Sequence, residues 1–256
     1  MKLLRAWTTL TSLTFRRLLW SASTMMVMLP LSGCLLLVLR LYYHRGHHEY
    51  SFKEFRDFSE FMILVFASFV VPICALAYGT ASLGGDREDR TLVFLLVRPI
   101  PRALVLLAKF TATLPLVLGL VVGSFWLYCR LSGEVGQMAF SLYLPALLAM
   151  TFAYVCLFHL FAVAFRHSTI IALIYALFME VLLGNLPGIV KRVAVNYYGR
   201  SIMYSAGAPE GLKSPDPEWF QPLEPETAMW ALAGIAVAGL LLALIVFSRR
   251  EYRDLT

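Results

Sequence analysis

Two side chains that could act as acid and base stand inside long apolar runs. Glu180 lies in YALFMEVLLGN, and His159 lies in a separate apolar run before it. A carboxylate and an imidazole can transfer protons together. They fall on different predicted segments, however, and neither GxSxG nor HExxH occurs in the chain. An enzyme that uses Glu180 with His159 is therefore an alternative and not the preferred interpretation.

Glu180 is a functional candidate in its own right, because burying a charge in an apolar run is costly. It could line a substrate path or bond across a dimer. The structural alternative is a protonated carboxylate, or one that pairs on a packed interface with a polar group such as Tyr175. The sequence leaves both interpretations open.

A histidine cluster, HRGHHEY, follows the first apolar run. Imidazoles at the spacing of His44, His47 and His48 can hold Zn or Cu. A flexible loop also collects histidines without such a role, and no second group of ligands is evident. We predict no metal site and keep these three residues as the candidates.

A nucleotide site is not expected in this chain. The phosphate-binding pattern GxxxxGK[ST] is absent, and the small-residue stretch YGTASLGG lacks the lysine that would reach a phosphate. We expect no cofactor on this chain and no enzymatic activity of its own.

The elements that carry these residues follow from composition. Hydrophobic residues make up 59% of the 256 and charged residues 15%, whereas a soluble domain carries about 25% charge. The net charge of +6 comes from basic residues that punctuate apolar runs and form no basic, aromatic-rich face. The composition predicts a membrane protein and argues against nucleic acid as a partner.

Six apolar segments are each near the length that crosses a bilayer. They predict an all-α membrane protein with a single transmembrane domain, 1–256. The fifth segment is the shortest. The six are Leu18–Leu41, Phe58–Leu83, Ala103–Tyr128, Phe140–Phe165, Thr169–Leu186 and Thr227–Phe247.

The orientation follows from the basic residues. The larger share of the 22 lysines and arginines falls on one side if both termini are cytoplasmic. Met1–Phe15 is then predicted to be an amphipathic helix on the cytoplasmic surface. Segment 187–226 is predicted to be a structured outer loop before the last span, with interfacial helices.

The stretch 86–102 has the sequence DREDRTLVFLLVRPIPR. It lies between the second and third spans, on the cytoplasmic side. Charges come first, then an apolar run, then prolines. Thr91 can help to start a short helix in the membrane plane, and Pro99 and Pro101 end it. An apolar helix exposed to the cytoplasm predicts a docking surface for another protein, with an ordinary interfacial loop as the alternative.

The longer stretch LGGDREDRTLVFLLVRPIPRALVLLAKF resembles the first cytoplasmic loop of type-2 ABC exporter permeases, in particular the single-domain bacterial type. That loop has the form GERERGTLELLLSRPISR followed by LLGKF. Arg90 departs from the pattern, since the family commonly has Gly before the Thr-Leu pair. The overall layout of six spans with a long outer loop before the last is also similar.

The resemblance implies a permease subunit of an ATP-driven exporter in the bacterial inner membrane. ATP and Mg²⁺ would be bound by a separate ATPase subunit, and the permease would form a homodimer or pair with a similar chain. A structural membrane subunit without transport is a further alternative. The residues implied to contact the ATPase are Asp86, Arg87, Glu88, Asp89, Arg90, Thr91, Leu92, Phe94, Leu95, Leu96, Pro99 and Arg102.

Overall fold

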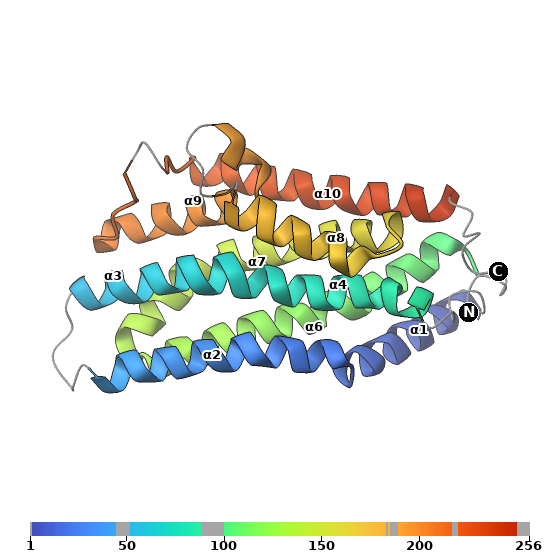
Figure 1. Cartoon of the computed structure of the whole chain (residues 1–256), viewed down its shortest axis with the longest axis horizontal. Helices are drawn as coiled ribbons and strands as arrows, with labels where there is room; N and C mark the ends of the chain where they lie inside the picture. The colour runs from blue at the N-terminus through green and yellow to red at the C-terminus, as the bar shows by residue number, and fades with distance from the viewer. Residues whose placement is uncertain are drawn as a thin grey trace.

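The computed structural model describes residues 2–44, 52–88, 100–182, 184, 189–216 and 220–249, and these are helical or in short connections, with no strand among them. The long helices run side by side (Figure 1). They are α1 (Lys2–Leu19), α2 (Ala22–His44), α3 (Phe52–Phe61), η1 (Met62–Val70), α4 (Val71–Glu88), α6 (Arg102–Leu131), α7 (Gly133–Ala164), α8 (Ser168–Tyr175), η2 (Ala176–Leu182), η4 (Ile189–Val193), α9 (Val195–Gly207), η5 (Ala208–Glu210) and α10 (Pro225–Arg249).

Helix α7 is the centre of the bundle. It contacts α3, α4, α6, α8, α9 and α10, whereas α2 and α10 bury only 22% and 28% of their apolar windows. The start of α1 and the end of α10 lie at one end of the bundle, hereafter the α1 end, and α9 lies near the other, hereafter the α9 end (Figure 1).

Five helical segments among the described residues are long and apolar enough to cross a membrane: Ala22–Arg40, Phe55–Arg87, Arg102–Leu131, Gly133–Ala164 and Pro225–Arg249. They correspond to five of the six predicted spans. The predicted span Thr169–Leu186 coincides with α8 and η2, but its apolar helix, Ser168–Glu180, is shorter than the others. A sixth crossing therefore stays a prediction.

The N-terminal helix is longer than predicted. It ends at Leu19, and the first span begins at Ala22, not at Leu18. The hydroxyls of Ser21 and Thr24 donate to the carbonyl of Leu18, at 2.7 and 2.9 Å, and so satisfy the end of α1. Helix α1 packs mainly along α6, where Thr11 donates to the carbonyl of Ala108 at 3.3 Å.

The second span changes its helical form along its length. Residues Met62–Val70 form a π-helix before α4 resumes the α-helix. Pro72, at the start of α4, has no N–H for the carbonyl four residues earlier. Ser68, inside the π segment, donates its hydroxyl to the carbonyl of Ile63 at 2.7 Å.

Helices α4 and α7 approach closely at Gly79. A Cβ at this position would lie 2.8 Å from Phe158 Cβ. Nothing lies within 4 Å of a Cβ built on Gly119 or Gly123. Gly79 therefore permits close packing of α4 on α7, whereas Gly119 and Gly123 have no such contact within the chain.

Candidate functional site

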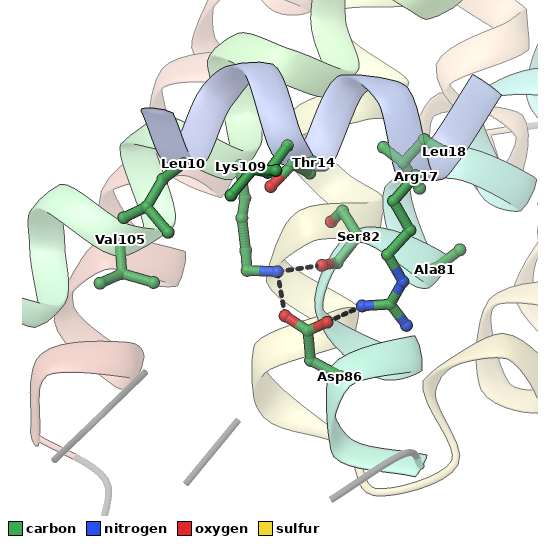
Figure 2. A pocket seen from close by; sticks show the side chains of 10 residues that line it. Leu10, Thr14, Arg17, Leu18, Ala81, Ser82, Asp86, Val105 and Lys109 are labelled. Carbon is green, nitrogen blue, oxygen red and sulfur yellow. Dashed lines mark hydrogen bonds and ion pairs between the residues drawn. The ribbon is translucent and has the colours of Figure 1, made fainter. Parts of the chain in front are cut away.

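A cavity of about 160 Å³ opens at the α1 end between α1, α4 and α6 (Figure 2). It lies directly beside the start of the charged stretch 86–102. Five of its ten lining residues are apolar, and three charged groups meet in it. The lining residues are Leu10, Leu13, Thr14, Arg17, Leu18, Ala81, Ser82, Asp86, Val105 and Lys109.

Asp86 holds two cations from two other helices. One carboxylate oxygen pairs with the guanidinium of Arg17 on α1, and the other pairs with the ammonium of Lys109 on α6 (Figure 2). Lys109 also donates to the carbonyl of Ser82 at 2.6 Å. The side chains of Asp86 and Lys109 are 5% and 4% exposed, and that of Arg17 is 46% exposed. The Asp86–Lys109 pair is thus a buried ion pair, in which each charge depends on the other.

Arg87 joins the end of α4 to the end of α7. Its guanidinium donates to the carbonyl of Phe165 at 2.7 Å and to that of Ala162 at 3.4 Å. A cation beside the last carbonyls of a helix is favourable, because these groups lack intrahelical partners and carry the negative end of the helix dipole. Asp86 and Arg87 together tie the last turn of α4 to α1, α6 and α7.

His159 extends this polar region into the bundle. Its Nδ1 lies 2.8 Å from the carbonyl of Val155, which can only accept, so Nδ1 carries a proton. Its Nε2 lies 3.2 Å from the hydroxyl of Ser82, the residue whose carbonyl receives Lys109. His159 is fully buried and has a structural partner at each ring nitrogen.

Glu180 has a separate set of partners. The hydroxyls of Tyr154 and Tyr175 donate to Oε2 and Oε1, at 2.8 and 2.9 Å. The backbone amides of Asn196 and Val195 donate to the same two oxygens, at 2.9 and 3.1 Å. The pairing with Tyr175 is the one that the structural alternative named. A substrate contact by Glu180 stays a prediction.

Only some of the residues predicted to dock the ATPase are among those that the structure describes. Asp86, Arg87 and Arg102 are described with their side chains, and Glu88 is the last residue of α4. Arg102 begins α6 immediately after Pro101, whose carbonyl accepts from the amide of Leu104 at 2.9 Å. The remaining predicted docking residues lie outside the described residues: Asp89, Arg90, Thr91, Leu92, Phe94, Leu95, Leu96 and Pro99.

The histidine cluster is also largely outside the described residues. His44 is the last residue of α2, and His47 and His48 lie beyond it. No group of three or more potential metal ligands occurs in the part of the chain that the structure describes. A metal site at these histidines stays untested.

Sequence reasoning missed Arg17 and Lys109 as partners of Asp86. Lys109 carried a signal, because it is a cation within the apolar stretch ALVLLAKFTATL, where an ionisable group calls for a partner. Its spacing of 23 residues from Asp86 gave no direct indication of contact. Arg17 was equally hidden, 69 residues from the same carboxylate.

The fold and its apolar helices define a multi-pass membrane protein. The family model described as "ABC-2 family transporter protein" matches residues 13–252, so the chain belongs to the ABC-2 transporter family. Membership supports the resemblance of the stretch 86–102 to type-2 ABC permeases and makes the chain a transport membrane subunit. Comparison with curated proteins gives no match.

Proposed function

We propose that this chain is the permease subunit of an ATP-driven exporter and that residues 86–102 dock a separate ATPase subunit. Family membership supports the permease assignment. The export direction and the ATPase contact rest on the resemblance of the stretch to the coupling loop of type-2 exporters. The protein works as a homodimer or with a similar permease, in the bacterial inner membrane with both termini cytoplasmic.

The observation that carries the docking proposal is the ion cluster at the base of this stretch. Asp86 stands near its start, Lys109 follows its end, and the two are paired, with Arg17 of α1 on the other carboxylate oxygen. A displacement of the stretch would be transmitted to α1, α4 and α6 together, because a buried ion pair is costly to separate. This is the mechanical property that coupling to an ATPase requires.

The same geometry weakens the enzyme alternative. Glu180 bonds to Tyr154, Tyr175 and the start of α9, whereas His159 bonds to Ser82 and Val155. Each group has its own partners, so the arrangement does not present them as one acid and base pair. The permease is the function that the site and the family support best.

The test is a mild detergent pull-down of the tagged chain from its native membrane, with mass spectrometry and an ATPase assay. An ATP-binding cassette protein should co-purify. Changing both Leu95 and Leu96 to Asp should release it, because charges would replace apolar anchors. The matched control places two Asp residues at Val190 and Val193, exposed apolar positions in η4, beyond η2, and should retain it.

Retention of the ATPase by the Leu95 and Leu96 variant, with normal membrane insertion, would remove the docking assignment. Recovery of the chain with no ATP-binding cassette protein would contradict the proposed function as a whole and favour a structural membrane subunit.

A further inference from the structure

Helix α9 begins without a capping side chain of its own. Its N-cap residue is Ala194, with φ −81° and ψ 131°, the extended conformation usual for that position. A methyl group accepts no hydrogen bond, yet the first amides of a helix have no intrahelical acceptor. The start of α9 is buried, since Ala194, Val195 and Asn196 are each at most 1% exposed. Water is therefore not available to replace the missing cap.

Glu180 supplies the acceptors from another helix. Its Oε1 accepts from the amide of Val195 at 3.1 Å, and its Oε2 accepts from the amide of Asn196 at 2.9 Å. These are the first two amides of α9. A carboxylate at this place is also favoured by the positive end of the helix dipole. Glu180 thus performs the role of an N-cap across a gap of 15 and 16 residues in the chain.

The carboxylate is itself held in place. Tyr154 on α7 donates to Oε2 and Tyr175 on α8 donates to Oε1, so each oxygen receives one hydroxyl and one amide. The ring of Tyr154 is stacked on that of Phe158, with 5.9 Å between the ring centroids. The four hydrogen bonds to its carboxylate therefore come from α7, α8 and α9.

A second contact ties the same point to the second span. The hydroxyl of Ser68, in the π segment η1, can donate either to the carbonyl of Ile63 at 2.7 Å or to Oδ1 of Asn196 at 3.0 Å. Glu180 itself lies in the other π segment, η2. Short π segments within helices frequently occur at functional sites. Here both of them meet at the first turn of α9.

We propose that Glu180 is a positioning residue. It caps α9 from another helix of the same chain and so fixes α9 to η1, α7 and η2 as one unit. Movement of the fifth apolar segment would then carry α9 with it. The cap does not depend on the proposed transport function, because it concerns this chain alone and requires no ATPase.

The test is hydrogen exchange, followed by mass spectrometry, on the full chain in lipid nanodiscs. In Glu180→Gln an NH₂ group replaces one of the two carboxylate oxygens. This group is a donor, and it would face the hydroxyl and the amide that donate to that oxygen in the wild type. Exchange at the amides of Val195 and Asn196 should accelerate at least about tenfold, because a hydrogen bond to a charged group is lost in a buried place. Peptides from α6 should be unchanged. The matched control is Glu210→Gln, in η5 beyond the other end of α9, which should leave both amides at the wild-type rate.

A rescue variant separates capping from packing. Adding Ala194→Ser to Glu180→Gln places a hydroxyl at the N-cap, from which it can accept from the second or third amide of the helix. Protection should return at Asn196, or increase above that of Glu180→Gln at Tyr197, but should not return at Val195. A purely packing role of Glu180 would give no such pattern, so the absence of any recovery would overturn the proposal. Wild-type exchange at Val195 and Asn196 in Glu180→Gln would also overturn it.

Two milder variants keep the proposal testable if Glu180→Gln does not fold. Tyr154→Phe and Tyr175→Phe each remove one hydroxyl that orients the carboxylate and preserve the ring. Each should accelerate exchange at the first turn of α9 by a smaller factor than Glu180→Gln would, about threefold for the loss of one orienting hydrogen bond. Unchanged exchange in both would contradict the assignment.

Discussion

Asp86 on α4 and Lys109 on α6 form a buried ion pair that brackets the stretch predicted to dock an ATPase. The two side chains are 5% and 4% exposed, and Arg17 on α1 completes the cluster from its more exposed side. The pair connects the helix before the stretch with the helix after it. Its energetics can be tested without knowing the partner or the substrate.

Changing Asp86 to Asn should strongly destabilise the purified chain. Lys109 would remain buried without its counter-charge, which typically costs about 3–5 kcal/mol. Arg17→Ala should cost less than about 1 kcal/mol, because half-exposed ion pairs contribute little. Thermal unfolding in detergent measures both. The double variant Asp86→Asn with Lys109→Met should recover most of the lost stability, because no unpaired charge remains buried. Equal losses of stability in Asp86→Asn and Arg17→Ala would show that Lys109 does not depend on Asp86.

Changing Gly79 to Ala should also destabilise the chain. The added Cβ would lie 2.8 Å from Phe158 Cβ, so α4 and α7 must move apart. Overpacking of this kind costs about 1–3 kcal/mol. Gly119→Ala is the matched control, since nothing lies within 4 Å of its new Cβ and Ala favours a helix. The melting temperature should fall for the first variant and hold or rise for the second; the reverse order would contradict the close approach of α4 and α7.

A topology reporter should place Lys213 on the opposite side of the membrane from both termini. The connection from α7 to α10 includes α8 and η2. These two elements together have 15 residues, from Ser168 to Leu182. A helix of this length spans about 22 Å. The bilayer core is about 30 Å thick, so the crossing needs the residues on either side of this helix or a locally thinner bilayer. Reporters fused to the termini and inserted at Lys213 decide the matter. Lys213 on the side of the N-terminus, with the C-terminus on the opposite side, would reduce the crossings to five and leave the α8 segment on one surface.

Salt should reveal whether charge contributes to docking. Besides Asp86, which is buried, and Arg87, which bonds to the end of α7, the predicted docking stretch carries Glu88, Asp89 and Arg90 before its apolar run. Exposed charges steer association and are screened at about 10 Å in 0.1 M salt. Raising the salt should slow re-association of the ATPase with the permease while the apolar anchors keep the formed complex intact. Immediate release of the ATPase by moderate salt would mean that the apolar anchors contribute little.

Hydropathy predicted the helical membrane class and the positions of five spans, because the length and apolarity of a run are local properties of the chain. It was less accurate where polar side chains shape the backbone. The first span starts at Ala22 because Ser21 and Thr24 bond to the carbonyl of Leu18. Hydropathy alone placed the start of this span at Leu18.

The sequence by itself determined that the chain is an all-helical membrane protein with a charged stretch between its second and third spans, and it identified Glu180 as a residue that needs partners. Only the tertiary structure decided what those partners are. Arg17 and Lys109 reach Asp86, and the amides at the start of α9 reach Glu180, because helix packing brings together residues that lie 15 to 69 positions apart. Ionisable groups in an apolar interior must be paired, but which group pairs with which depends on the relative placement of whole helices.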